Sequence, residues 1–130
     1  MPNWCATTYV ARGSKECIHS LHERLESDWE VVHENDFGDR WLGLLAQEYG
    51  IPWDTVPCRG TMDYVSSIRK NDHYQNCWEF TFETETAWEP CRELFSCIEE
   101  QEDVSLFYCA TDPGLQFFET NDKEGNIFSL

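Results

Sequence analysis

The chain has 130 residues, of which 41% are hydrophobic and 15% aromatic, and its 25 acidic and 9 basic residues give a formal net charge of −16. This length predicts one domain over residues 1–130, and the aromatic content argues against intrinsic disorder. A surface of this charge repels phosphate backbones and anionic lipids, so the composition disfavours direct binding to nucleic acid or a membrane and favours a basic partner.

The N-terminus and the cysteines bear on the cellular compartment. The stretch MPNWC has neither the basic nor the apolar region of a signal peptide, and no apolar run approaches the roughly 20 residues of a membrane-spanning helix. Seven cysteines are an odd number without the rhythm of a disulfide scaffold. Together these features predict a cytoplasmic protein in which most cysteines behave as small buried apolar residues.

A strand pattern and a helix pattern follow each other at the start of the chain. Residues 4–11 (WCATTYVA) are rich in Thr, Tyr and Val and predict a strand. Ser14 is a candidate N-cap for a helix over residues 15–28. The predicted helix has one apolar face, which consists of Ile18, Leu21, His22, Leu25 and Trp29.

Residues 30–57 have the least clear pattern and are interpreted as an insertion between the first helix and the second strand. Asp39 is a candidate cap for a short helix that ends at Gly50. Pro52 and Pro57 then mark a loop.

A hairpin and a second strand-to-helix joint come next. Residues 61–70 predict the second strand, and residues 77–85 predict the third, whose alternation places on one face Trp78, Phe80 and Phe82. Pro90 suits the first turn of a helix, because its fixed φ and missing amide are tolerated there. We expect this second helix to reach about residue 101.

Strands over residues 104–110 and 115–120, separated by an Asp-Pro-Gly turn, complete the pattern. The order β-α-β-β-α-β, with the insertion at about 30–57 and an extra C-terminal strand, predicts an α+β fold of the ferredoxin-like type. In that topology one antiparallel sheet carries both helices on the same face. The name describes topology only, since no cysteine cluster has iron–sulfur spacing.

Two motifs resemble those of the YubB-like ferredoxin-fold domain family, which consists of small proteins from plasmids, phages and gut bacteria without a generally assigned activity. They are the initial MPNWC and the later FTFETETAW-x-P. The family's F-x-T-A-W-x-P-P stretch is matched, with a two-residue difference in spacing, by Phe82, Thr86, Ala87, Trp88 and Pro90. The second proline is Cys91 here. The resemblance implies the fold and a mobile-element or bacterial source, and it transfers no catalytic residue.

Trp88 stands where the third strand gives way to the second helix. We expect its large ring to plug the end of the sandwich, and the alternative is an aromatic side chain that binds a ligand. Trp4 is given the same interpretation, and the pattern does not say whether the two rings touch.

Candidate catalytic and metal-binding groups are sparse. His19 and His22 point about 60° apart around a helix axis, so we interpret them as one solvated and one packed histidine instead of a metal pair. A second candidate zinc set lacks the C-x-x-C knuckle of strong zinc motifs, and it consists of His73, Cys77, and Cys91 or Cys109. Because no nucleophile elbow, Walker loop or Rossmann glycine pattern occurs, we predict no cofactor, no metal and no enzymatic activity.

The feature that points most directly to a function is a set of carboxylates on the outward faces of both predicted helices. The set consists of Glu16, Glu23, Glu26, Glu89, Glu93, Glu100 and Asp103. Since both helices of this topology cover one sheet face, we expect the two rows to lie side by side. Such rows resemble the charge spacing of a nucleic-acid backbone, and only three lysines are present to compensate them. The alternative is an ordinary solvated face.

The sequence therefore predicts a non-enzymatic module that binds a basic protein through this acidic surface. In its sharpest form it is an inhibitor that mimics nucleic acid and blocks a basic host or defence protein. Two alternatives stay open, namely a small-ligand or metal-dependent enzyme and a self-associating structural module. The pattern does not predict the oligomeric state.

Overall fold

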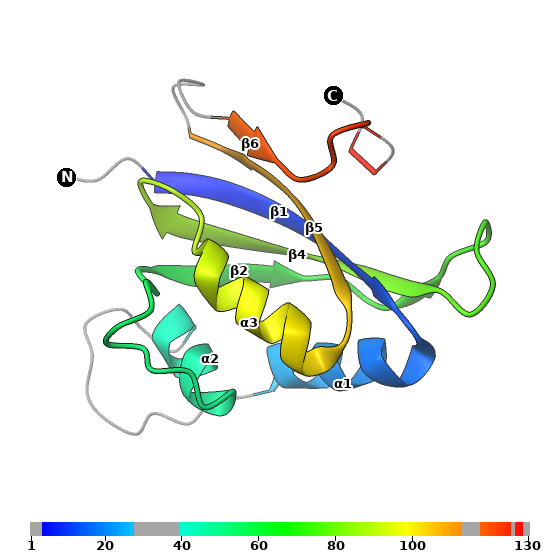
Figure 1. The fold of residues 1–130 in the computed structure, drawn as a ribbon, viewed down its shortest axis with the longest axis horizontal. Helices are drawn as coiled ribbons and strands as arrows, with labels where there is room; N and C mark the ends of the chain where they lie inside the picture. Colours follow the sequence, from blue (N-terminus) through cyan, green and yellow to red (C-terminus); the bar gives the residue numbers. More distant parts are fainter. Residues whose placement is uncertain (1–3, 28–39, 113–117, 126, 129–130) are drawn as a thin grey trace.

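The computed structural model describes residues 4–27, 40–112, 118–125 and 127–128. In these residues the chain forms a mixed α+β fold with a six-stranded antiparallel sheet and three helices (Figure 1). The elements in chain order are β1 (Trp4–Gly13), α1 (Lys15–Glu26), α2 (Leu42–Glu48), β2 (Gly60–Val65), β3 (Arg69–Lys70), β4 (Trp78–Ala87), α3 (Arg92–Glu102), β5 (Ser105–Thr111) and β6 (Phe118–Thr120).

β1 is the central strand of the sheet. The strand order is β2-β4-β1-β5-β6, and β3 pairs with the first residues of β4. Every neighbouring pair is antiparallel, and Tyr9 of β1 lies opposite both Phe82 of β4 and Tyr108 of β5. Because side chains alternate along a strand, one face of β1 is turned into the interior and carries Cys5, Thr7, Tyr9 and Ala11.

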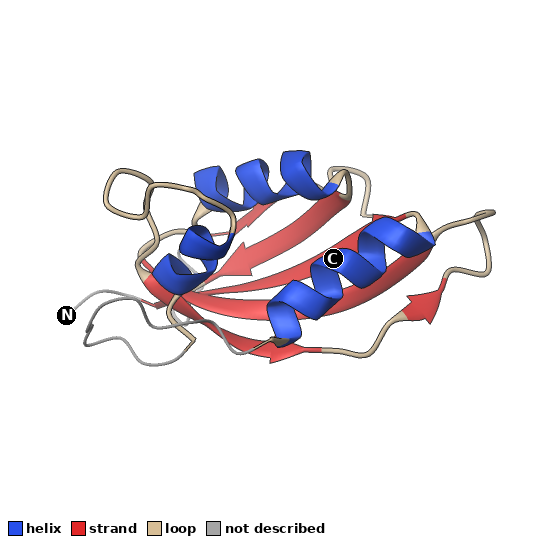
Figure 2. Cartoon of the chain, turned by 90° about the horizontal axis from the view of Figure 1, so that it is seen from below, coloured by secondary structure: helices blue, strands red, loops and turns tan. Residues whose placement is uncertain are grey.

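The helices cover one face of the sheet. Phe80 and Phe82 are two residues apart on β4 and therefore point to the same side. The ring of His22 on α1 lies 4.9 Å from that of Phe80, and the ring of Phe95 on α3 lies 5.6 Å from that of Phe82. α1 and α3 thus share this face, and Figure 2 shows the helices against the strands.

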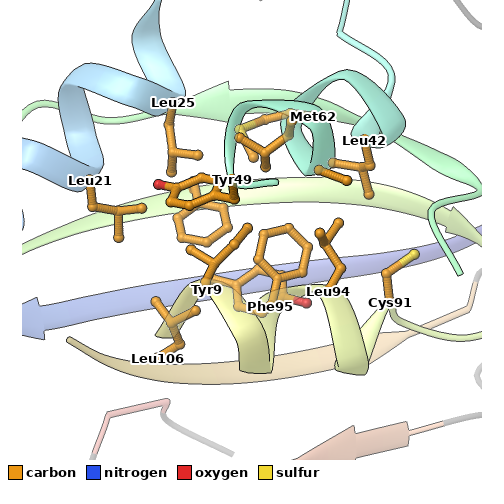
Figure 3. Packing of buried hydrophobic residues seen from close by; sticks show 14 of the residues in the cluster. Tyr9, Leu21, Leu25, Leu42, Tyr49, Met62, Cys91, Leu94, Phe95 and Leu106 are labelled. Carbon is orange, nitrogen blue, oxygen red and sulfur yellow. The ribbon is translucent and has the colours of Figure 1, made fainter. Parts of the chain in front are cut away.

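The core fills the space between the sheet and the helices. Tyr9 stacks on Phe82 with 4.7 Å between ring centroids, and Phe95 of α3 packs on the same tyrosine at 4.7 Å. Leucines from both long helices surround these rings (Figure 3). Each fully buried side chain of this size stabilises the fold by about 1.5–3 kcal/mol, so burial fixes both helices on the sheet.

The start of α1 is as predicted. The Ser14 hydroxyl accepts a hydrogen bond from the Cys17 amide at 3.2 Å, which confirms Ser14 as the N-cap. Ile18, Leu21 and Leu25 form the buried stripe of the helix. The last predicted helical residue and the predicted apolar Trp29 lie outside the described residues.

The second predicted strand, residues 61–70, is wrong as one continuous element. β2 ends at Val65, its register with β4 shifts between Met62 and Tyr64, and β3 has only two residues. At the break, the Ser66 hydroxyl accepts from the Thr81 amide at 2.8 Å and so replaces a ladder hydrogen bond. A side chain that can satisfy the neighbouring strand lets the backbone leave the ladder here.

The predicted insertion contributes to the core. α2 confirms the short helix, which ends before Gly50 at a φ of +68°. The predicted N-cap Asp39 is wrong, because the residue that caps α2 is Trp41, directly before Leu42. Asp39 itself lies outside the described residues. Leu42, Leu44 and Leu45 are all fully buried. Residues 42–48 are therefore part of the helical layer that covers the sheet.

The last part of the chain differs in its element boundaries. α3 begins at Arg92 with Cys91 as its N-cap, two residues later than the proline rule predicted, and buried Pro90 lies in the preceding turn. The helix ends at Glu102, and its C-cap Asp103 adopts the left-handed conformation. β6 covers the end of the predicted strand 115–120, of which residues 115–117 lie outside the described part.

Candidate protein-binding surface

The structure places all seven predicted carboxylates at exposed positions of α1, α3 and the residues that flank α3. We call this set the acidic helical face, and it consists of Glu16, Glu23, Glu26, Glu89, Glu93, Glu100 and Asp103. Both helices lie on the same side of the sheet, but α3 runs obliquely to α1 (Figure 1). The two rows are therefore inclined to each other instead of parallel.

Few basic groups neutralise the acidic helical face. The Glu26 carboxylate lies 3.7 Å from His22 Nε2, and the Glu89 carboxylate lies 3.5 Å from the Arg92 guanidinium. Within the described residues, no ion pair involves the other five members of the face. Exposed carboxylates without counter-charges raise the local negative potential.

One of the arginines near this face, Arg24, makes its contacts between the helices. The guanidinium of Arg24 lies 4.7 Å from the centre of the Tyr49 ring and donates to the Glu48 carbonyl at 3.0 Å. Its Nε is 3.9 Å from the largely buried Glu102 carboxylate of α3. Burial and the nearby Glu102 charge raise the pKa of Tyr49 above its ordinary value. Arg24 therefore joins α1, α2 and α3 internally.

A second arginine joins α3 to β6. Arg92 donates to both carboxylate oxygens of Glu119, at 2.6 and 2.5 Å, and the Tyr108 hydroxyl donates to the same carboxylate. The hydrogen bonds from Arg92 lower the pKa of Glu119, while burial raises the pKa of Tyr108. Beside the network lies a cavity of about 210 Å³ with an apolar floor of Tyr9, Phe95 and Leu106. Because the carboxylate is held ionised and accepts hydrogen bonds at both oxygens, it is a poor general base.

Sequence reasoning missed a buried carboxylate on the opposite sheet face. Glu79 is almost fully buried and accepts from Asn71 Nδ2 at 2.7 Å and from Arg69 Nη2 at 3.3 Å. Arg12 Nε lies 3.6 Å from the same carboxylate. The three charged groups come from β1, β3 and β4, so only the strand register brings them together. Lys70 lines the same cavity of about 290 Å³.

Trp88 does not plug the sandwich, and the sequence-based expectation is wrong here. Its side chain is 55% exposed, its φ is +70°, and the Glu89 amide donates to the Ala87 carbonyl across it at 2.8 Å. Trp4 is also exposed, by 41%. Within the described residues, no contact joins the Trp4 and Trp88 rings. The sequence pattern revealed neither the positive φ nor the exposure of this indole.

The histidines of α1 lie as interpreted. His22 packs edge-on against Phe80, and its Nε2 is 2.8 Å from the Ser66 carbonyl. His19 is exposed, and its Nδ1 is 2.7 Å from the Lys15 carbonyl. In the part of the chain that the structure describes, no group of three or more His, Cys, Asp or Glu residues is placed to hold a metal ion.

All seven cysteines are free thiols, and three of them are buried, fewer than the expected majority. The buried three are Cys5, Cys58 and Cys91. Burial raises the pKa of Cys91 to about 12 and that of Cys58 to about 11. These two thiols are therefore poor nucleophiles at neutral pH.

None of the helices within the described ranges has the length and apolar character needed to span a bilayer. No family model matches the chain, and no curated protein or solved structure matches it significantly.

Proposed function

We propose that this chain is a non-enzymatic module that binds a basic protein through the acidic helical face. The observation that carries the proposal is the distribution of the few cations. Arg24 is engaged between the helices, Arg92 mainly with Glu119, and Arg12 and Arg69 with Glu79. Five carboxylates of the face are left without an ion pair in the described part of the chain. An ordinary solvated helix surface would mix both signs.

The spacing of these carboxylates supports a partner with an extended basic groove. Glu93 and Glu100 are seven residues apart on α3, which corresponds to about 10 Å along the axis. The repulsion between these carboxylates is relieved when a basic surface approaches. Their negative electrostatic potential also attracts such a surface and so accelerates association. Binding of this kind weakens with added salt, because salt screens exposed charges.

The fold proposal is the ferredoxin-like βαββαβ sandwich. It is supported by the order β2-β4-β1-β5, by antiparallel pairing throughout, and by α1 and α3 on one sheet face, with β6 as the extra strand. On this basis we also propose kinship with the YubB-like family, a mobile-element or bacterial source and a cytoplasmic site of action. The sharpest functional version is an inhibitor that presents a nucleic-acid-like surface to a host or defence protein.

The test is capture of basic proteins from a bacterial lysate on the immobilised chain, followed by elution with salt or with duplex DNA. The test variant combines Glu23→Gln, Glu93→Gln and Glu100→Gln, all on the acidic helical face. The control variant makes the same change in charge elsewhere on the surface, at Glu48→Gln, Asp54→Asn and Glu83→Gln.

We expect the test variant to weaken binding of the captured partner about tenfold, since three exposed charge interactions of about 0.5 kcal/mol each are lost. The control variant should keep the affinity of the unmodified chain. DNA should displace the partner, because both ligands compete for one basic groove. Equal capture by both variants, or no basic partner at low salt, contradicts the proposal.

A further inference from the structure

The turn at Trp88 holds a bulky residue in a disfavoured backbone conformation. Its φ of +70° and the hydrogen bond from the Glu89 amide to the Ala87 carbonyl define the rare γ-turn with positive φ. For a residue with a large side chain this region is strongly disfavoured, because Cβ crowds the backbone. Strain of this kind persists only where the surroundings impose it, and it is concentrated at functional sites.

The surroundings of Trp88 impose the conformation from both sides. The fully buried Thr86 donates its hydroxyl to the Glu89 carbonyl at 2.7 Å and so closes the turn. The Ala87 amide donates to the Arg59 carbonyl at 2.9 Å, and Pro90, which follows Glu89, is buried. The backbone is therefore fixed while the indole remains 55% exposed. The core gains little from this ring in return for the strain.

Trp4 provides a second exposed indole at the same end of the sheet. It lies opposite Ala87 in the β1–β4 register, next to the turn. Exposed carboxylates flank the pair, since Glu85 lies two residues before Ala87 on β4 and Glu89 follows Trp88. We call these four residues the tryptophan end, and it consists of Trp4, Glu85, Trp88 and Glu89.

Elsewhere in the described residues, three aromatic rings are covered by cations of the same chain. Arg24 lies over Tyr49, Arg12 over Tyr74 and Lys15 over Trp78, at 4.7, 5.9 and 5.4 Å from the ring centres. No cation of the described residues lies over Trp4 or Trp88. An indole face attracts ammonium and guanidinium groups more strongly than other aromatic side chains do.

We propose that the tryptophan end is the binding site for an arginine or lysine side chain of a protein partner. The cation would lie on the face of the Trp88 indole, with the flanking carboxylates around it. This inference rests on the proposed function, because it names the group by which the basic partner would be anchored. A second copy of the chain fits the site poorly, since two chains of net charge −16 repel each other.

The test uses a hexa-arginine peptide and the full chain labelled with ¹⁵N, observed through the indole N–H signals. Salt is raised to about 0.3 M, where long-range attraction is largely screened. We expect the Trp88 and Trp4 signals to shift on titration, whereas the signal of the buried Trp41 should stay in place. Trp88→Gly should weaken peptide binding about fivefold, which corresponds to one lost cation–π contact. Glycine adopts a positive φ readily, so this variant should keep the fold.

The control is Tyr74→Leu, which removes an exposed ring that Arg12 already covers. It should bind the peptide like the unmodified chain. Unchanged binding by Trp88→Gly, or an equal loss with Tyr74→Leu, overturns the inference. So does a dimer on a sizing column that Trp88→Gly dissociates, because the ring would then contact a second copy.

Failure of the proposed function has a different signature. The triple variant at Glu23, Glu93 and Glu100 tests the acidic helical face and leaves the tryptophan end intact. Suppose that variant binds a captured partner normally while Trp88→Gly does not. Binding through the acidic helical face is then refuted, and binding of a cation at the Trp88 indole is supported. If only the triple variant loses binding, cation binding at the Trp88 indole is refuted, and binding through the acidic helical face is supported.

Discussion

The two ends of the sheet differ in whether cations of the same chain contact their carboxylates and aromatic rings. Where β1 leads into α1, Arg12 and Arg69 enclose the buried Glu79, and Lys15 lies over the Trp78 ring. We call this the basic end, and it consists of Arg12, Lys15, Arg69, Lys70, Trp78 and Glu79. At the tryptophan end, two indoles are exposed beside carboxylates, and no described cation covers them.

This difference shows how an acidic chain distributes nine basic residues. Four of them lie at the basic end, where the register places Arg12 and Arg69 opposite Glu79, and Lys70 opposite Trp78. Arg12 and Arg69 there neutralise Glu79, and Lys15 covers the Trp78 ring. Within the described residues, no cation covers the two indoles of the tryptophan end, and five carboxylates of the acidic helical face have no ion pair. These rings and charges are therefore available to another molecule.

The largest effect is expected from Glu79→Gln at the basic end. The substitution keeps the shape of the side chain but leaves the Arg12 and Arg69 guanidinium groups without their buried carboxylate. We expect a loss of about 2 kcal/mol in the free energy of unfolding, after allowance for the partial exposure of both arginines. Urea denaturation measures it. Glu83→Gln, exposed on the same strand and face, is the control and should change stability by less than about 0.5 kcal/mol.

The second prediction compares two substitutions at the tryptophan end. Trp88→Ala and Trp88→Gly both remove the indole, but only glycine relieves the positive φ. We expect the glycine variant to be the more stable of the two by about 1 kcal/mol in urea denaturation. A glycine variant that is less stable than the alanine variant would show that the turn is not strained, and the contrast between the two ends would lose its structural basis.

Much of the fold follows from local patterns. The alternation of Phe80 and Phe82 and the Ser14 cap depend on residues close in sequence, and the structure confirms both elements. The break after Val65 was not predictable in this way, because it depends on Ser66 satisfying an amide of β4. The burial of α2 likewise depends on its position over the sheet, which no periodicity within residues 30–57 reveals.

In the candidate surfaces too, the features that depend on local periodicity were predictable, and those that depend on strand register or on one backbone angle were not. Helical periodicity alone predicts that Glu93 and Glu100 point away from the core, and both are exposed. The location of the counter-charges depends on strand register, which brings Arg12 of β1 to Glu79 of β4. The exposure of Trp88 depends on one backbone angle, and the sequence around it carries no glycine or asparagine to indicate a positive φ.

The third prediction concerns Arg92, the cation that pairs with Glu89 of the tryptophan end. Its hydrogen bonds lower the pKa of Glu119 in the folded chain. A carboxyl whose pKa is lower in the folded chain than in the unfolded chain stabilises the fold. This stabilisation is present above the pKa of the unfolded chain, about 4.3 for Glu, and is lost as the pH falls through the pKa of the folded chain. Glu119→Gln should therefore lower stability at pH 7 by about 1 kcal/mol, and the difference should become smaller as the pH falls below the unfolded pKa. A constant difference above and below that pKa would contradict the ion pair as the cause.

The smallest effect is the coupling between Lys15 and Trp78 at the basic end. Lys15→Met alone should change stability little, because a cation in the first turn of α1 is disfavoured by the helix dipole while its contact with the ring is favourable. A double-mutant cycle with Trp78→Leu separates the two contributions and should give a coupling of about 0.5 kcal/mol. The matched cycle of Arg59→Met with Trp88→Gly should give none, since Arg59 adjoins the turn without lying over the indole. Equal coupling at both ends would mean that Trp88 already has a cation of its own chain, and a partner would then have no vacant ring to occupy.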